Sequence, residues 1–473
     1  MSGQIKLALP KGRFVIPTAE LLKEAGLGLN DYGGETRRYR LKSTIPFHIL
    51  AKVFQEKDIP VEVAIGNYDL GICGSDWVEE LLVRYSASDL VKISGLNYGE
   101  GSIYAGASCQ RKWSNLDELL ARQDSIIRVV SEYPNLAEAF ALNLRIRRFR
   151  IFPVWGAAEV YPPENAEIAI MWGRNERDLE SKGLFSLRNM LPVNACLIAN
   201  RRSLESKDLS QVISCLIMAS RKQPQFVAKP NAFIPEKPTE AALNWGEKEI
   251  KLALPDGHQQ LPTARFLKKA GLDLQGYGEG ELSPRPYIID MDWAGVKVIR
   301  PQDMPLQVAN ANFDLAITGE DWLLDHLYCF PSSPVEELLN LGFGVVRIVA
   351  AASSDVPVTS IDELRLLVRS GRLAYLKVAS EYVNIADKYL RDNHISPYRL
   401  IPTYGASEAF LPEDADLLID NVQTGQTLAQ HNLKIIDVLI NSSACLIGNK
   451  DSLSSNKREK IDFIIRTLQT ESP

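Results

Sequence analysis

The chain has 473 residues, of which 45% are hydrophobic and 24% charged, and its 53 Lys and Arg residues against 59 Asp and Glu residues give a net charge of −6. This is the composition of a soluble globular protein with a sizeable core, and it excludes disordered and collagen-like chains. The mild acidity also argues against a nucleic-acid binder, which usually carries a basic stripe to neutralise phosphates.

Apolar runs, cysteines and histidines argue against membrane, secreted, disulfide-bonded and metal-binding proteins. No stretch reaches the ~18–20 uninterrupted apolar residues of a membrane helix, and the N-terminal residues lack the apolar run of a signal peptide. The 6 cysteines are scattered without CxxC spacing, and no two of the 5 histidines stand four residues apart. Neither a disulfide framework nor a metal site is indicated. We expect a cytoplasmic protein that binds neither membrane nor nucleic acid.

The first elements alternate between strand and helix patterns. Residues 5–10 (IKLALP) form a predicted strand, and residues 17–26 form a predicted amphipathic helix that Gly26 closes. Residues 68–74 (YDLGICG) form a buried strand, and Asp76 lies just beyond its carboxyl end, where open α/β sheets bind ligands. These patterns predict a parallel sheet with crossover helices.

The alternation continues and predicts a second lobe. Residues 125–132, 148–154 and 166–171 have strand character, and a helix is predicted to start at Asn135. We therefore expect two lobes with a cleft between them.

The sequence then repeats itself. IKLALP at Ile5 returns at Ile250, an offset of 250 − 5 = 245 residues, and after a four-residue insertion near 365–372 the offset becomes 249. A repeat of this length indicates duplication of a whole domain, and two like domains can pack about a pseudo-twofold axis as a homodimer does.

The repeat sets the domain organisation. Residues 1–221 form copy one and residues 248–473 form copy two, and residues 222–247 contain four prolines among polar residues, which indicates a semi-rigid linker. The fold class expected is α/β, with two tandem two-lobed copies forming a pseudo-dimer.

Copy two contains a candidate phosphate loop at residues 424–427 (TGQT). Asp416 and Asp420 precede it, four residues apart in a predicted strand and hence on one face, with Asp420 at the strand end. Unpaired N–H groups, two hydroxyls and a glycine at a helix start suit a phosphate, while a strand-end carboxylate suits ribose hydroxyls. The alternative is an ordinary threonine N-cap with a turn glycine.

The chain resembles the short form of the ATP phosphoribosyltransferase family of histidine biosynthesis. The resemblance covers nearly the whole of both copies, and the motifs that carry it occur in the family's order: LALPKGR, RPQDMP, DLAITGEDW, LGFGVVRIVAAAS, SEYVNIA, YGASEAF and DNVQTGQTL. It implies a two-lobed fold like that of type II periplasmic binding proteins. It also implies transfer of the phosphoribosyl group of phosphoribosyl pyrophosphate (PRPP) to N1 of ATP, with Mg²⁺ carried by the pyrophosphate.

The resemblance assigns roles to individual residues. It implies that Arg13 and Arg37 are catalytic cations close to the nucleotide and the leaving pyrophosphate, and that Arg13 reaches the neighbouring subunit's site. PRPP binding is expected at Asp416, Asp420, Thr424, Gly425, Gln426, Thr427, Leu428 and Glu408. Nucleotide binding is expected at Lys11, Arg38, Arg300, Gly319 and Asp321.

Several of these residues have an ordinary structural alternative. Arg300 could instead form an ion pair with Asp303, Asp321 could cap a helix, and Glu408 could favour a helix start. The cysteines are expected in the core.

Each copy departs from the family pattern at a different place. In copy one, residues 175–178 (NERD) replace the phosphate loop, and Met171 replaces Asp420. Two carboxylates at that position would repel a phosphate. In copy two, residues 256–258 (DGH) replace the Lys-Gly-Arg motif, and the arginines equivalent to Arg37 and Arg38 are missing.

The complementary losses suggest one composite site per chain, with PRPP in copy two and arginines from copy one. The competing explanation is drift after duplication, which leaves the arginines as a solvated patch. The expected function is ATP phosphoribosyl transfer. A non-catalytic regulatory protein that binds nucleotide or PRPP, and transfer to another acceptor, remain as alternatives. A homo-oligomer and a separate regulatory subunit are both open.

Overall fold

The computed structural model describes residues 4–33, 39–43, 46–110, 115–121, 126–222 and 248–472. Arg37, Arg38 and all but the first residue of the predicted linker lie outside the described residues, so the predictions about them remain predictions. In the part of the chain that is described, no helix is both long and apolar enough to cross a membrane.

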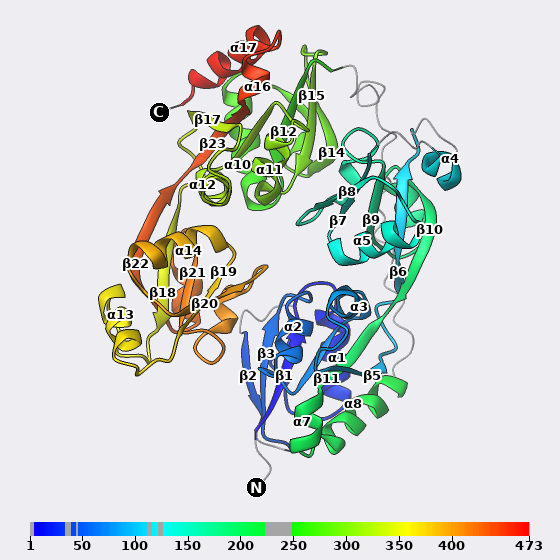
Figure 1. The fold of residues 1–473 in the computed structure, drawn as a ribbon, viewed down its shortest axis with the longest axis vertical. Coiled ribbons are helices and arrows are strands. Elements are labelled where there is room, and N and C mark those ends of the chain that lie inside the picture. The colour runs from blue at the N-terminus through cyan, green and yellow to red at the C-terminus, as the bar shows by residue number, and fades with distance from the viewer. Residues whose placement is uncertain are drawn as a thin grey trace.

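Copy one folds into two α/β lobes, each built on one sheet (Figure 1). The first lobe has the strand order β2-β3-β1-β4-β11-β5, with β1 (Ile5–Pro10), β2 (Arg40–Ser43), β3 (Ile49–Phe54), β4 (Leu70–Gly74), β5 (Leu90–Gly95) and β11 (Ala195–Asn200). Its helices are α1 (Val15–Glu24), α2 (Ile59–Ala64), α3 (Ser75–Arg84), α7 (Arg201–Ser206) and α8 (Ser210–Lys222). Strands β3, β4 and β11 are buried throughout, as continuous apolar runs covered on both faces require.

The second lobe of copy one has the order β10-β6-β9-β7-β8. Its strands are β6 (Gly101–Ser108), β7 (Ile127–Ser131), β8 (Phe149–Pro153), β9 (Ile168–Gly173) and β10 (Leu184–Val193). Its helices are α4 (Leu116–Leu120), α5 (Pro134–Asn143), η1 (Ala158–Val160) and α6 (Glu176–Ser181). The chain passes between the lobes after β5 and again after β10, because β11 returns to the first sheet.

Copy two repeats this architecture. Its first lobe has the order β15-β12-β16-β23-β17 and a separate hairpin; the strands are β12 (Ile250–Pro255), β13 (Leu274–Gly278), β14 (Glu281–Ile288), β15 (Ala294–Ile299), β16 (Leu315–Gly319), β17 (Val335–Asn340) and β23 (Ala444–Asn449). Its helices are η3 (Gly257–Gln259), α10 (Gln260–Lys269), η4 (Pro301–Asp303), α11 (Met304–Ala309), α12 (Glu320–Cys329), α16 (Lys450–Leu453) and α17 (Arg458–Gln469).

The second lobe of copy two has the order β20-β19-β21-β18-β22. Its strands are β18 (Val346–Ser353), β19 (Leu376–Ser380), β20 (Tyr398–Pro402), β21 (Leu417–Val422) and β22 (Leu433–Ser442). Its helices are α13 (Ile361–Arg369), α14 (Val383–Asp392), η5 (Ser407–Phe410) and α15 (Gln426–Gln430). The predicted α/β class with two tandem two-lobed copies is confirmed.

Most predicted elements are present with small shifts at their ends. The first strand has the predicted bounds, and the helix predicted at 17–26 starts two residues earlier, at Val15. Gly26 follows it with φ of +65°, the left-handed conformation in which glycine commonly closes a helix. The helix predicted from Asn135 starts at Pro134.

The two copies pack so that the first lobe of each lies against the second lobe of the other (Figure 1). Two apolar cores are shared between the copies. In one of them Phe54 of β3 packs edge-on against Phe410 of η5, with ring centroids 5.0 Å apart. The other combines Val160 and Ala166 of copy one with Ile299 and other residues of copy two. The copies therefore form one body, with the pseudo-dimeric arrangement expected from the repeat.

A matching polar contact lies in each shared core. The ammonium of Lys52 donates to Asp414 Oδ2 at 2.9 Å. The ammonium of Lys297 donates to Glu164 Oε2 and Asn165 Oδ1, each at 2.9 Å. Because 52 + 245 = 297 and 414 − 249 = 165, the repeat relates the two contacts to each other, as a pseudo-twofold axis requires.

Candidate functional site

The loop at 424–427 connects the carboxyl end of β21 to α15. Gly425 has φ of +77°, a left-handed conformation that glycine adopts without strain. Thr424 and Gln426 are exposed, and the Gln426 N–H donates weakly to Thr424 Oγ1 at 3.5 Å. Leu428 is 4% exposed and anchors α15 in the shared core. The loop is thus held at its base and open at its tip.

Three carboxylates lie together beside this loop. Asp420 lies near the end of β21, Glu408 lies in η5, and Glu381 directly follows β19. Burial raises the pKa of Asp420 well above its ordinary value, and the charges of Glu381 and Glu408 raise it further. Burial likewise raises the pKa of Glu381 to about 7, although Lys57 and Lys11 oppose this shift. A ligand that brings hydroxyl donors or positive charge would stabilise such a cluster.

Copy one contacts the helix that this loop opens. Lys11 Nζ donates to the Tyr39 hydroxyl at 2.7 Å. The Tyr39 ring stacks on His431, the residue after α15, with centroids 4.6 Å apart and planes 8° from parallel. The charge of Lys11 acts on both His431 and Glu381. The structure therefore brings the predicted residue Lys11 to the copy-two site across the interface between copies.

The equivalent loop of copy one, at 175–178, is closed by its own side chains. Asn175 Oδ1 accepts the Asp178 N–H at 3.0 Å, and Asp178 Oδ2 accepts the Arg174 N–H at 3.2 Å. Side-chain oxygens of the chain thus occupy N–H groups that a phosphate would use. These hydrogen bonds agree with the prediction that a loop with the carboxylates of Glu176 and Asp178 does not bind phosphate.

Arg13 lies in the cleft between the lobes of copy one. Its Nη2 contacts Asp76 Oδ2 at 2.7 Å, and its Nε donates to Glu56 Oε2 at 3.0 Å. The guanidinium also lies 4.8 Å from the ring centre of Trp172, and Asp76 accepts the Tyr133 hydroxyl at 2.7 Å. Burial opposes the charge of Arg13, but the two carboxylates more than offset this and raise its pKa. This placement differs from the expected one beside the copy-two loop.

The corresponding cleft of copy two is open. It contains a cavity of about 250 Å³, whose lining includes Asp256, His258, Arg300, Asp321, Glu381 and Asn421. His258 is equivalent to Arg13 (13 + 245) and Asn421 to Trp172 (172 + 249). Smaller side chains therefore stand where the arginine and the tryptophan occupy the cleft of copy one.

Arg300 forms an ion pair with Asp256 at 3.0 Å, at the edge of this cavity. The alternative pair with Asp303 is not formed. Both carboxylate oxygens of Asp303 instead accept the backbone N–H of Trp155 from copy one, at 3.0 and 3.1 Å. Arg300 is 44% exposed at its side chain, so it can reach a ligand in the cavity.

Asp321 lies in the first turn of α12 and does not cap that helix. Its carboxylate accepts hydrogen bonds from the hydroxyls of Tyr382, at 2.6 Å, and Ser442, at 2.9 Å. A Cβ at Gly319 would lie 2.0 Å from Asp321 Oδ1, so a glycine is needed there. These contacts link the first lobe of copy two to the second at the rear of the cavity.

Asp416 lies away from the loop. It directly precedes β21, and its Oδ2 accepts the backbone N–H of Lys377 at 2.9 Å. Asp420 is four residues further along, which at ~3.3 Å per residue separates the two aspartates by about 13 Å. Glu167 makes the same contact with Arg128 in copy one, at 2.7 Å. The structure thus gives Asp416 a role in joining strands and does not bring it to the loop.

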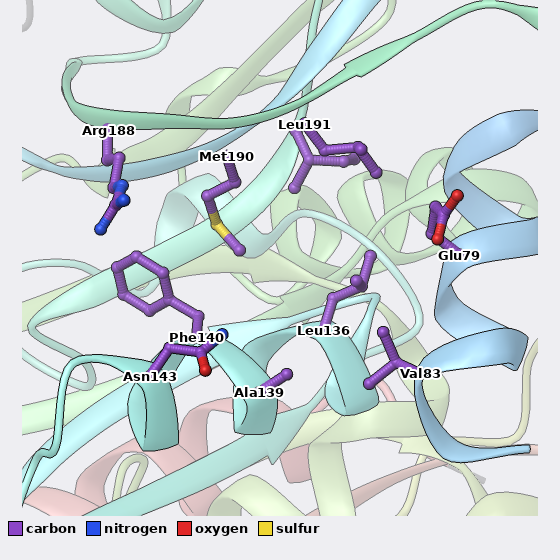
Figure 2. Close-up of a pocket in the computed structure, with 10 residues that line it drawn as sticks. Glu79, Val83, Leu136, Ala139, Phe140, Asn143, Arg188, Met190 and Leu191 are labelled. Carbon is purple, nitrogen blue, oxygen red and sulfur yellow. The ribbon is translucent and has the colours of Figure 1, made fainter. Parts of the chain in front are cut away.

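Copy one carries a further cavity of about 250 Å³ between α3, α5 and β10. Figure 2 shows its apolar lining, which includes Leu136 and Phe140 of α5, between Arg188 on one side and Glu79 on the other. At the equivalent positions of copy two, Tyr389 donates a hydrogen bond to Asp437 at 2.6 Å. None of the residues assigned from the sequence lines this cavity.

Two residues near the copy-two site were not predicted from the sequence, namely Tyr39 and Lys57. Tyr39 has Pro284 as its counterpart (39 + 245), and Lys57 has Gln302 (57 + 245). These differences between the copies were visible in the repeat and are the signal that could have identified both residues.

Comparisons with known proteins agree with the fold. The ATP phosphoribosyltransferase (HisG) family matches residues 55–219 and 300–470. The protein named ATP phosphoribosyltransferase from Saccharolobus solfataricus is 32% identical over 227 residues, which are 47% of this chain and 72% of that protein. Its namesake from Methanocaldococcus jannaschii is 33% identical over 224 residues, with the same two shares of 47% and 72%.

Two solved structures that resemble this chain each cover about half of it. The ATP phosphoribosyl transferase (HisG:HisZ) complex from Thermotoga maritima covers 47% of this chain and 98% of that one, with 24% identity and a TM-score of 0.38. The periplasmic aliphatic sulphonate binding protein SsuA from Escherichia coli covers 47% and 68%, with 11% identity and a TM-score of 0.30. The two segments matched by the family span well over half of the sequence, and the chain therefore belongs to the ATP phosphoribosyltransferase family, in two tandem copies.

Proposed function

We propose that this chain transfers the phosphoribosyl group of PRPP to N1 of ATP and releases pyrophosphate, the first step of histidine biosynthesis, at one composite site. The observation that supports a single site is the contrast between the two loops. The described N–H groups of the 424–427 loop make one weak side-chain hydrogen bond, from Gln426 to Thr424 Oγ1 at 3.5 Å. In copy one, Asn175 Oδ1 accepts the Asp178 N–H at 3.0 Å, and the Asp178 carboxylate accepts the N–H of Arg174, just before the loop. PRPP therefore binds to copy two.

The carboxylates beside the loop suit the ribose. When the bond from the anomeric carbon to pyrophosphate breaks, positive charge develops on the ribose ring. Asp420 and Glu408 accept hydrogen bonds from the ribose hydroxyls in this proposal, and Glu381 lies close enough to both to act on the same charge. N1 of adenine attacks with its own lone pair, so no general base is required.

The cavity of copy two receives the ATP. It lies between the two lobes and contains Arg300, an exposed cation able to pair with a phosphate. Lys11 supplies positive charge from copy one, and Arg37 and Arg38 remain the cations proposed for the leaving pyrophosphate. Arg13 contributes indirectly, by holding copy one together.

Mg²⁺ enters this proposal as part of the substrate, bound to the pyrophosphate of PRPP. Among the described residues, no group of three or more His, Cys, Asp or Glu side chains is arranged to hold a metal ion. A divalent cation beside Asp420 would relieve the repulsion that Glu381 and Glu408 exert on its carboxylate.

Titration of the chain with PRPP by calorimetry, beside an assay of ATP-dependent pyrophosphate release, tests the proposal. We expect one PRPP per chain. Thr424→Ala removes a hydroxyl and should weaken PRPP binding roughly tenfold or more, because hydrogen bonds to charged groups contribute ~1.5–3 kcal/mol. Asn175→Ala, at the equivalent position of copy one, is the matched control and should leave PRPP affinity unchanged.

The same measurements separate the alternatives. Two PRPP molecules per chain would contradict the single site. PRPP binding without pyrophosphate release from any acceptor would favour a non-catalytic regulatory protein, and release with another acceptor but not with ATP would change the substrate. A cytoplasmic location, and a homo-oligomer or separate regulatory subunit, are part of the proposal and are tested by fractionation and by light scattering.

A further inference from the structure

Lys57 lies where all four lobes meet. It belongs to the first lobe of copy one, and its Nζ is 3.8 Å from the ring centre of Tyr404, in the second lobe of copy two. The same atom is 4.9 Å from the ring centre of Trp155, in the second lobe of copy one. Its charge also acts on Asp303, in the first lobe of copy two. No other described lysine or arginine has aromatic contacts in both second lobes.

The charge at this position breaks the symmetry of the repeat. The carboxylates that face Lys57 are those of Asp58, Glu132, Asp303 and Glu381. They form two pairs related by the repeat, because 58 + 245 = 303 and 132 + 249 = 381. The counterpart of Lys57 is Gln302, a neutral amide whose Oε1 is buried without a hydrogen-bond partner. The four carboxylates come equally from both copies, but the ammonium that they face, that of Lys57, comes from copy one alone.

Of these carboxylates, Glu381 belongs to the copy-two site. It lines the cavity of copy two, and its charge acts on Asp420 beside the phosphate loop. Its counterpart Glu132 belongs to copy one, whose loop is closed by Asn175 and Asp178. An effect of Lys57 on Glu381 is therefore an effect on the site.

The contact with Tyr404 fixes the backbone that leads to Glu408. The backbone N–H of Tyr404 faces the carboxylate of Asp58 and lowers its pKa, against the larger effect of burial. A Cβ at Gly405 would lie 2.7 Å from Nε2 of Gln55, so copy one packs closely on this turn. Residues 55–58 of copy one thus hold the segment of copy two in which Glu408 lies.

We propose that Lys57 is a positioning residue of the copy-two site, whose side chain on the face of Tyr404 fixes the place of that turn beside the cavity that Glu381 lines. This rests on the proposed function for the identity of the ligand, which is the ribose-bearing donor. The ammonium lies on the face of an aromatic ring instead of in an ion pair with a described carboxylate, so it acts on Glu381 through its field and through the turn.

The charges around Glu381 give the sign of the expected effect. Burial raises the pKa of Glu381 to about 7, and Lys57 is the strongest of the influences that oppose this shift. Glu408 raises the pKa of Glu381 and Lys11 lowers it, and the charge of Glu381 also acts on Asp420 and Asp58. Without the ammonium the pKa of Glu381 rises above about 7, so the ionised fraction of its carboxylate falls further in the neutral range.

The test compares Lys57→Gln, which installs the residue found in copy two, with Lys57→Arg, which keeps the charge. We expect the acidic limb of kcat/KM for PRPP to move to higher pH in Lys57→Gln. At pH 7 its kcat/KM should fall about fivefold or more, and at pH 9 it should lie within about twofold of wild type, because one pKa unit changes ionisation tenfold. Lys57→Arg should restore the wild-type profile.

Lys92→Gln is the control, since Lys92 is an exposed lysine of β5 in copy one whose ammonium pairs with Glu79. It should leave the profile unchanged. A Lys57→Gln profile that superimposes on wild type would overturn the proposal, as would a Lys57→Arg variant that is impaired equally at every pH, which indicates a purely structural role.

Failure of the proposed function would look different. If the wild-type chain binds PRPP but releases no pyrophosphate with ATP, calorimetric PRPP affinity at pH 7 and pH 9 replaces the kinetic readout. Loss of affinity at pH 7 in Lys57→Gln, with recovery in Lys57→Arg, then supports the role of Lys57 while the transfer reaction is contradicted. Wild-type turnover with an unaltered Lys57→Gln profile overturns only the role of Lys57.

Discussion

Arg13 occupies the cleft of copy one much as a ligand would. Its guanidinium lies between Glu56 and Asp76 of the first lobe and the ring of Trp172 in the second. The Tyr133 hydroxyl crosses from the second lobe to the same Asp76. Copy one is thereby held closed by its own side chains, and it presents Lys11 and Lys57 to copy two from a fixed body. A residue expected to act on the substrate thus makes its described polar contacts within copy one.

We predict that Arg13→Ala lowers the free energy of unfolding by about 3 kcal/mol, because it leaves two carboxylates in the cleft without their cation. Removing one partner of a buried ion pair costs about 3–5 kcal/mol. The loss of stability should lie at the lower end of this range, because the Arg13 side chain is 27% exposed. Urea unfolding followed by circular dichroism measures it. Arg188→Ala, at an exposed position on the same copy, is the control. An Arg13→Ala chain with wild-type stability but no turnover would restore the direct catalytic role that the resemblance implies.

At the scale of elements, the sequence predicted the repeating unit well. Apolar runs such as IKLALP predicted the strands, because a strand covered on both faces must be apolar throughout. The carboxylates of the 175–178 loop predicted that this loop does not bind phosphate. This was predictable because a carboxylate acts on backbone N–H groups only a few residues away in the sequence. The position of Arg13 was not predictable, since it depends on Glu56 and Asp76, 43 and 63 residues away. The replacement of Lys57 by Gln302 in the repeat was visible in the sequence, but its meaning was not, because the neighbours of Lys57 come from all four lobes.

The turn into α15 gives a prediction at this scale. Gly425→Ala should lower stability by about 1 kcal/mol, because a residue with a Cβ is strained at φ of +77°. The strain of ~1–2 kcal/mol moves the loop away from the geometry that binds phosphate. Restoring that geometry on binding costs the same free energy, so the KM for PRPP should rise roughly tenfold. Gly183→Ala is a matched control in copy one, with φ of +76° and open space around its Cβ.

The two variants should share the loss of stability and differ in KM. Steady-state kinetics at varied PRPP and thermal unfolding of both variants measure these quantities. A KM that rises equally in Gly183→Ala would show that general destabilisation, and not the geometry of the loop, is responsible.

At the scale of the whole molecule, the composite site depends on the two shared cores. Each first lobe packs on the second lobe of the other copy, and a lysine from β3 or β15 reaches across each contact to a carboxylate. Lys52 and Lys297 are both 0% exposed, so neither can be solvated if its partner is lost. The relative position of the copies, and with it the approach of Lys11 and Lys57 to the copy-two loop, is therefore coupled to these buried charges.

Glu164 provides the pH-dependent test of this coupling. Burial alone would raise its pKa, but Lys297 and Arg285 lower it from 4.5 to about 2. A carboxylate whose pKa is depressed on folding stabilises the fold above its unfolded pKa, and that contribution is lost as the pH falls toward 2. The shift corresponds to about 3 kcal/mol. Glu164→Gln should thus lower the free energy of unfolding by about 3 kcal/mol at pH 7, by less at pH 4, and hardly at all near pH 2.

Urea unfolding of both chains at pH 7, 4 and 2.5 measures this difference, and comparing variants cancels the many other groups that titrate. Glu167→Gln is the control from the same lobe, since Glu167 pairs with Arg128 at a partly exposed site where an ion pair contributes ~1 kcal/mol or less. A Glu164→Gln difference that stays constant from pH 7 to pH 2.5 would show that packing, and not charge, holds this contact together. In that case the polar contacts would not set how closely copy one approaches the phosphate loop of copy two, and the apolar cores around Phe54 and Ile299 would do so alone.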